Sequence, residues 1–233
     1  MYNCEIEFAN INLNWKFPFM VSQLPAPATE PFDFLIKGLR SFGLTARAIN
    51  LESPTNNLDD VAMVLNLLNH KFTLRLTYSG IEAEGRDIYA EEVLQILQIL
   101  SVVFDSLEKI DTETKKGLGV VRLSLHLKLL EETVDEYLSE RVSAKLNSES
   151  VKPEAVVFSL NFDEFTKYFP TKITLAKSLA VENGLFLDIN YQSGKNEQEL
   201  QTKEPIEFLQ MLSEHYQSLL TFLELNAIVE EES

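Results

Sequence analysis

The chain has 233 residues, of which 45% are hydrophobic and 24% are charged. This composition excludes disorder as the main state and allows a sizeable core, in one large domain or two small ones. The formal net charge of −16 disfavours direct binding to nucleic acid, because such a site usually shows a basic stripe. A net charge far from zero also keeps a protein soluble, so acidity alone identifies no function.

The single cysteine, Cys4, excludes an internal disulfide, and together with only three histidines it is a poor supply of ligands for structural zinc. The N-terminus shows neither the basic start nor the apolar run of a signal peptide. The most apolar stretch, residues 93–107, includes two glutamines and an aspartate and is shorter than the roughly 20 residues that a membrane span needs. We therefore expect a cytoplasmic protein that does not enter a membrane.

Apolar and polar residues alternate through the first 17 residues, and this period of two predicts a strand. The apolar positions change from even to odd numbers across Ala9 and Asn10, so we expect a bulge or a turn there. A proline-rich loop is predicted over 19–31. A helix is predicted over 32–42, with Gly43 ending it.

The next elements are predicted from periodicity and turn residues. They are a strand over 44–51, a helix over 58–69, a strand over 72–78 with a short return over 81–86, and a long helix over 90–110.

A polar segment, residues 111–119, follows the long helix and holds two glycines, which makes it the best linker candidate. After it the order of elements repeats. The predicted elements are a strand over 121–129, a helix over 131–146, a strand over 155–162, a helix that begins at 163–169 and resumes over 173–181, a strand over 185–191, and a helix from Pro205 to about Asn226.

The two parts of the chain also match locally. The matching residues are Phe72, Leu74, Leu76 and Tyr78 with Leu185, Leu187, Ile189 and Tyr191, and Leu94, Gln95 and Leu97 with Leu209, Gln210 and Leu212. An internal duplication explains the match, although strand-turn-helix units also resemble one another by physics alone. We predict an α+β fold of two similar halves, each with a mostly antiparallel or mixed sheet and packed helices that include a long C-terminal one. The expected boundaries are a first half over 1–112, a linker over 113–119, a second half over 120–228 and an acidic tail over 229–233.

No familiar phosphate-binding or catalytic motif occurs: the sequence lacks Gly-x-Gly-x-x-Gly, the P-loop pattern, His-Glu-x-x-His and Gly-x-Ser-x-Gly. Adjacent carboxylates occur in four places, Asp59–Asp60, Glu91–Glu92, Glu131–Glu132 and Asp163–Glu164. Each pair falls in the first turn of a predicted helix, where negative charge is favourable. We therefore predict no catalytic residues, no metal site and no cofactor, and Cys4 is expected to be buried and inert.

One predicted strand face carries Arg122, Ser124, His126 and Lys128. Its two fixed positive charges stand out in an acidic protein, and they indicate either a site for an anion or an acidic partner, or simply a solvated sheet face. His215 is expected at the surface or boundary of its helix.

The segment that enters the proline-rich loop is aromatic, with Trp15, Phe17 and Phe19 at alternate positions. Large apolar side chains in such a place either cover a core or meet a partner. The candidate partner-binding residues are thus Trp15, Phe17, Phe19, Arg122, His126 and Lys128.

The missing catalytic motifs favour a non-catalytic protein-binding or adaptor protein, one component of a larger assembly with an unidentified protein partner. Two alternatives stay open at this point. One is an acidic inhibitor or nucleic-acid mimic that occupies a basic groove. The other is an enzyme whose site assembles from distant residues.

Overall fold

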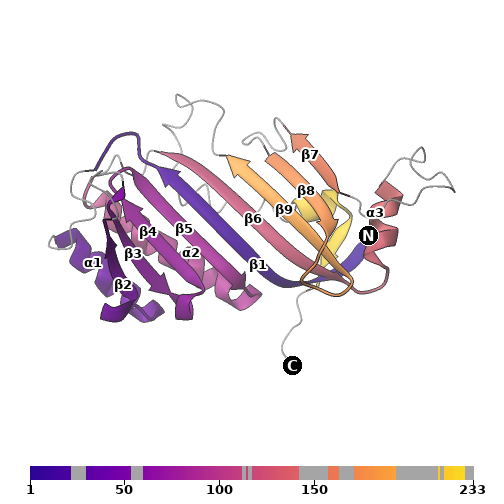
Figure 1. The fold of residues 1–233 in the computed structure, drawn as a ribbon, viewed down its shortest axis with the longest axis horizontal. Coiled ribbons are helices and arrows are strands. Elements are labelled where there is room, and N and C mark those ends of the chain that lie inside the picture. Colours follow the sequence, from indigo (N-terminus) through magenta and orange to yellow (C-terminus); the bar gives the residue numbers. More distant parts are fainter. Residues whose placement is uncertain are drawn as a thin grey trace.

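Ten strands form one sheet that extends through the described part of the molecule (Figure 1). The structure is a computed structural model of the chain, and it describes residues 1–21, 30–53, 60–111, 114, 117–141, 157–162, 171–192, 215 and 218–228. The strands are β1 (Tyr2–Lys16), β2 (Ile49–Glu52), β3 (Ala62–Leu67), β4 (Phe72–Thr77), β5 (Gly80–Ile88), β6 (Leu118–Leu129), β7 (Phe158–Phe162), β8 (Thr171–Lys177), β9 (Gly184–Gln192) and β10 (Leu225–Ala227). The α-helices are α1 (Glu30–Leu39), α2 (Ala90–Glu108) and α3 (Val134–Arg141), and short 3-10 turns span Arg40–Phe42, Ala46–Ala48 and Leu68–His70.

The order of the strands across the sheet is β2-β3-β4-β5-β1-β6-β9-β8-β7, and β1 is the middle strand of this path. Every neighbouring pair along the path is antiparallel. The longest pairing joins β1 to β6, from Cys4 opposite Leu129 to Lys16 opposite Leu118. The short strand β10 lies parallel to the first residues of β1.

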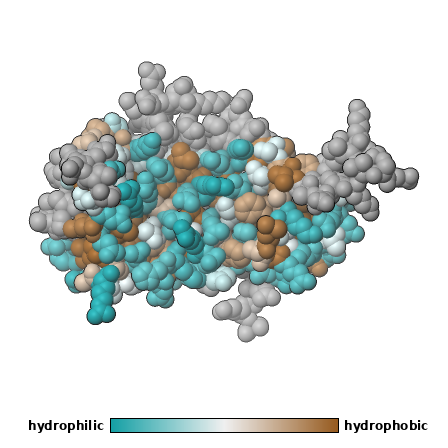
Figure 2. Space-filling view, viewed as in Figure 1, coloured by the Kyte–Doolittle hydropathy of each residue, from teal (hydrophilic) through white to brown (hydrophobic). Residues whose placement is uncertain are grey.

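The two faces of the sheet differ because side chains alternate along each strand and paired residues point to the same side. One face is apolar and forms the core: α1 and α2 cover it beside β1, and the Trp15 ring meets Phe104 of α2 edge to face at 5.7 Å. The buried cluster also includes residues near the C-terminal end, among them Leu219 and Leu223. The other face is polar, and hydrophilic residues dominate the sheet in Figure 2.

The predicted irregularity in β1 is confirmed. The register between β1 and β5 shifts between Ala9 and Ile11, and the Asn10 side chain accepts a hydrogen bond from the Asp87 backbone N–H at 3.0 Å. A second shift, against β6, lies between Ile6 and Phe8. Against β6 the extra residue is Glu7 of β1, which explains why the even-numbered Cys4 before it and the odd-numbered Ala9 and Leu13 after it reach the same core. At the shift between β1 and β5 the extra residue lies on β5, between Gly85 and Ile88.

Many of the predicted elements are confirmed. The helix over 32–42 corresponds to α1 and the following 3-10 turn, and Gly43 ends it with a φ of 83°, a conformation that favours glycine. The long helix over 90–110 is α2, and the strands at 72–78, 81–86, 121–129, 155–162 and 185–191 are β4, β5, β6, β7 and β9. Of the strand expected over 44–51 only the end, β2, is a strand.

The predicted fold class is wrong. Within the described ranges the strands form a single large sheet, and neither two similar halves nor a long C-terminal helix is found among those residues. Near the C-terminus the described helical residues include 218–222, and β10 follows them. Alternation identifies a strand but not its neighbour, so the sequence did not reveal that β1 pairs with β6. The domain boundaries stay a prediction; β6 begins inside the expected linker, and the tail over 229–233 lies outside the described residues.

Two predicted helices are strands. The helix expected over 58–69 contains β3, whose residues 62–65 are all buried. A short run buried on both sides has no period of two, so it resembles a buried helical turn. The helix expected to resume over 173–181 contains β8, in which buried Ile173 and Leu175 alternate with polar residues. The helix start expected at 163–169 lies outside the described residues.

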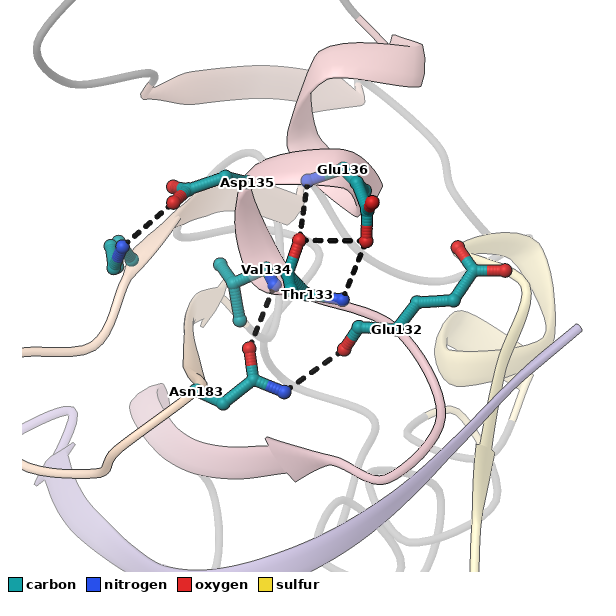
Figure 3. A network of polar contacts seen from close by, with 7 residues as sticks. Glu132, Thr133, Val134, Asp135, Glu136 and Asn183 are labelled. Carbon is teal, nitrogen blue, oxygen red and sulfur yellow. Dashed lines mark hydrogen bonds and ion pairs between the residues drawn. The ribbon is translucent and has the colours of Figure 1, made fainter.

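The turn after β8 is tied to the start of α3 by one side chain, Asn183 (Figure 3). Its Nδ2 donates to the backbone oxygens of Leu129 at 3.0 Å and Glu132 at 2.9 Å. Its Oδ1 accepts the backbone N–H of Val134 at 3.0 Å. Asn183 has a φ of 50°, a conformation that asparagine tolerates better than most residues. A single residue thus satisfies three backbone groups where the chain leaves β6.

The first turn of α3 is capped within the same network. The Thr133 hydroxyl accepts the Glu136 N–H at 3.2 Å, and Glu136 accepts the Thr133 N–H at 3.0 Å (Figure 3). The hydrogen bonds from the backbone and side chain of Thr133 lower the pKa of the Glu136 carboxyl. Lys177 of β8 bridges to Asp135 at 2.9 Å. The predicted start of this helix at Glu131 is therefore too early by one turn.

Replacing Asn183 tests this junction. Asn183→Ala leaves three backbone groups without their partner, and we expect a loss of about 2 kcal/mol in the free energy of unfolding, measured by urea denaturation. Asn183→Asp keeps the acceptor for the Val134 N–H but places a charged carboxylate oxygen against the carbonyl oxygens of Leu129 and Glu132, so its loss should be at least as large. An Asn183→Ala protein as stable as the wild type would show that the network contributes nothing.

Candidate functional site

The polar face of the sheet lies opposite α1 and α2, and we call it the open face. Its members follow from the strand registers and from the alternation of side chains. They are Asn50, Glu52, Val64, Asn66, Thr73, Arg75, Glu82, Glu84, Glu5, Phe8, Asn10, Asn12, Asn14, Lys16, Val120, Arg122, Ser124, His126, Lys128, Phe186, Asp188, Asn190, Lys172, Thr174, Ala176 and Ser159. All but Val64 are exposed or half-buried.

The face predicted from the alternation in β6 is confirmed, because Arg122, Ser124, His126 and Lys128 do lie on one side of the sheet. Arg122 donates two hydrogen bonds to Asp188 of β9, from Nε to Oδ1 at 2.8 Å and from a terminal nitrogen to Oδ2 at 3.1 Å. Ser124 donates to the same carboxylate at 2.8 Å. The hydrogen bonds that Arg122 donates to Asp188, together with the charge of that carboxylate, raise the pKa of the Arg122 guanidinium. These two parallel hydrogen bonds, here called the Arg122–Asp188 fork, hold both side chains in one geometry.

A second set of charges lies across β1, on β2, β4 and β5. Arg75 donates to Glu82 at 3.1 Å and lies 3.8 Å from Glu52, so it links three strands. Glu84 pairs with Arg86 at 2.8 Å. These ion pairs order long side chains before anything binds to them, although each is exposed enough that its net stabilisation is small.

Three rings form a row across β1, β6 and β9. His126 stacks on Phe8 at 4.4 Å between centroids, with an interplanar angle of 20°, and its other neighbour is Phe186 at 5.1 Å. All three rings are half-buried. Alternation along the chain does not reveal Phe8 and Phe186 as neighbours of His126, because only the pairing of the strands brings them beside it.

The protonation of His126 follows from its hydrogen bonds. The Ser178 Oγ accepts the backbone N–H groups of Ala180 and Val181, both at 3.2 Å, which uses its acceptor capacity. Its hydroxyl proton is then available for His126 Nδ1, which lies 2.8 Å away. Nδ1 is therefore the acceptor, and the ring carries its proton on Nε2. Burial lowers the pKa of His126, and the nearby Asp87 opposes that shift only in part.

The aromatic candidates do not join this face. Trp15 and Phe17 are 1% and 8% exposed and lie in the core, while Phe19 is 41% exposed. The Trp15 indole N–H donates to the backbone oxygen of Thr114 at 3.3 Å. The structure therefore separates Trp15 and Phe17 from Arg122, His126 and Lys128. The interpretation that they cover the core agrees with their burial.

Two other titratable side chains are buried. Cys4 is fully buried, and desolvation raises its pKa to about 11, so the thiol stays protonated and unreactive at neutral pH. His215 is 4% exposed and its ring lies 5.4 Å from that of Tyr191, so the expected surface position is wrong. Burial lowers its pKa. The described residues contain no cluster of three or more His, Cys, Asp or Glu that could hold a metal ion.

No model of a known protein family matches the chain, and no curated protein matches it. None of the helices in the described ranges is long and apolar enough to cross a membrane.

The lowered pKa of His126 predicts that the free energy of unfolding depends on pH. The folded-state pKa of His126 lies below its unfolded value of about 6.5. The unfolded chain therefore binds protons more readily, so stability present above pH 6.5 is lost as the pH falls below it. In His126→Gln the new side chain can accept the hydrogen bond from the Ser178 hydroxyl but does not titrate. We therefore expect this variant to lose less free energy of unfolding than the wild type between pH 7.5 and 5.5, measured by urea denaturation.

The exposed Asn12, on the same face of the sheet, offers a control that does not titrate. Asn12→Gln should show the wild-type dependence on pH. Equal losses in the wild type and in His126→Gln would refute the assigned role of His126.

Proposed function

We propose that this chain is a non-catalytic protein-binding component of a larger assembly, and that a protein partner docks on the open face. The observation that carries the proposal is a broad sheet face that α1 and α2 do not cover. Charged side chains on this face already form ion pairs with one another. Arg122 remains 57% exposed while its fork is fixed by Asp188. Side chains ordered in advance lose less entropy when a partner binds.

The size of the open face suits a protein partner. Nine strands about 4.8 Å apart span roughly 38 Å, and six residues along each strand add about 20 Å. The product, about 800 Å², is what one protein contributes to an interface of standard size.

The charges on this face argue against a nucleic-acid mimic. At the paired positions of its strands the face carries five basic side chains and five acidic ones, and Arg86 and Asp87 at the end of β5 add one of each sign. The paired ones are Lys16, Arg75, Arg122, Lys128 and Lys172, and Glu5, Glu52, Glu82, Glu84 and Asp188. Their sum is zero, whereas a mimic needs a continuous array of carboxylates. The face is equally unsuited to nucleic acid itself, which requires a basic surface. The proposal places the protein in the cytoplasm, where the buried Cys4 stays a thiol.

Affinity purification with charge variants tests the proposal. Lys128→Glu with Lys172→Glu reverses two exposed charges on the open face. The matched control, Lys37→Glu with Arg40→Glu, makes the same change of net charge at exposed positions on the helical side. We expect tagged wild type and control to recover a stoichiometric protein from the native host, and the face variant to lose most of it.

Mass spectrometry of the recovered material supplies the readout, and unfolding midpoints establish that both variants fold. Recovery of no stoichiometric protein by the wild type, or equal recovery by all three proteins, would contradict docking on this face.

A further inference from the structure

The charges on the open face are divided by its middle strand. The β2–β5 part, here the acidic side, holds Glu52, Glu82, Glu84 and Arg75, a formal charge of −2. Arg86 and Asp87 at the end of β5 have opposite signs and leave this sum unchanged. The acidic side therefore presents excess carboxylates to anything that lies over it.

The part beyond β1, made by β6, β9, β8 and β7, is the basic side. It holds Arg122, Lys128, Lys172 and Asp188, a formal charge of +2. Between the two sides, β1 presents a row of uncharged asparagines, Asn10, Asn12 and Asn14, with Glu5 and Lys16 of opposite sign towards its two ends. The face is thus an electric dipole centred on β1.

A surface with this pattern is complementary to itself. A twofold axis parallel to β1, midway between two facing sheets, lays the acidic side of each copy over the basic side of the other. A twofold axis across the strands would instead lay acidic side over acidic side and basic side over basic side. On β1 itself the parallel axis lays Glu5 and Lys16 each over its own counterpart, so the attraction comes from the two sides. Because β1 is the middle of the nine-strand path, the first axis also matches the outlines of the two sheets. Self-complementarity about a twofold axis is what an isologous dimer requires.

We propose that the occupant of the open face is a second copy of this chain, packed face to face about a twofold axis parallel to β1. This inference rests on the proposed function and names its partner. The estimated area of about 800 Å² for each copy reaches that of a stable interface. Sheets can pack in this way about 10 Å apart with their strands nearly aligned.

The contacts are polar and the net charge of −16 repels another copy, so the dimer is reversible. Specificity comes from the pairing of opposite sides, which a charge exchange can test. Lys128→Glu with Lys172→Glu makes both sides acidic, and Glu82→Lys with Glu84→Lys makes both sides basic. Neither variant is then complementary to itself, but each is complementary to the other.

Sedimentation velocity of the purified full-length chain is the first test. We expect a concentration-dependent dimer of the wild type, a dissociation constant raised by at least about tenfold for each variant alone, and recovery of the dimer when the two variants are mixed. The control Lys37→Glu with Arg40→Glu should dimerise as the wild type does. A wild type that is monomeric throughout, or a mixture that forms no dimer although both variants fold, overturns the proposal.

Cross-linking provides a test that needs no charge reversal. A residue of β1 on the open face lies opposite its own counterpart across the axis, so Asn12→Cys should be joined to itself by a short bismaleimide. Ser159→Cys, on the outer strand β7, should not, because β7 lies over β2 of the other copy. Cys4 is fully buried and gives no background. Failure of Asn12→Cys to cross-link, or equal cross-linking of Ser159→Cys, overturns the arrangement.

The failure of this inference can be told from the failure of the proposed function. Suppose that the wild type is monomeric, and that it recovers a different protein which Lys128→Glu with Lys172→Glu loses. The claim that the partner is a second copy is then wrong, and docking on the open face stands. If no stoichiometric protein is recovered either, both are wrong.

Discussion

The antiparallel pairing of β1 with β6 is the interaction on which the rest of the structure depends. Its ladder runs from Cys4 opposite Leu129 to Lys16 opposite Leu118, and β1 also holds β5 and β10 on its other side. Every other strand reaches the sheet through one of these two. Because paired residues share a face, this register sets which side becomes the core and which stays in water.

A bulge in β1 at Glu7 keeps that division intact over a strand of 15 residues. Without it, the even-numbered Cys4 and the odd-numbered Leu13 would lie on opposite sides of the sheet, yet both are buried. A second irregularity lies on β5, where the Asp87 N–H donates to the Asn10 side chain of β1. The Glu7 bulge therefore serves the core and also places Phe8 on the open face, beside His126.

The sequence predicts local features of this molecule well and long-range pairing poorly. Alternation in β6 was enough to place Arg122, His126 and Lys128 on one face, and the change of parity near Asn10 was enough to predict a bulge in β1, which lies three residues earlier, at Glu7. Alternation does not identify partners, so the single sheet, the Phe8–His126 stack and the Arg122–Asp188 fork were missed. β3 was mistaken for a helix because burial on both faces removes the period of two.

The central claim is that β1 and β6 join all the described strands into one cooperative sheet whose open face is a fixed surface. Native-state amide hydrogen exchange measures this most directly, since it reports the free energy of opening for each strand. The account predicts that the amides in β1, β5, β6 and β9 exchange only through global unfolding, with a common opening free energy. If the strands on one side of the β1–β6 pair open several kcal/mol more easily than those on the other, the sheet is not one unit and the claim is contradicted.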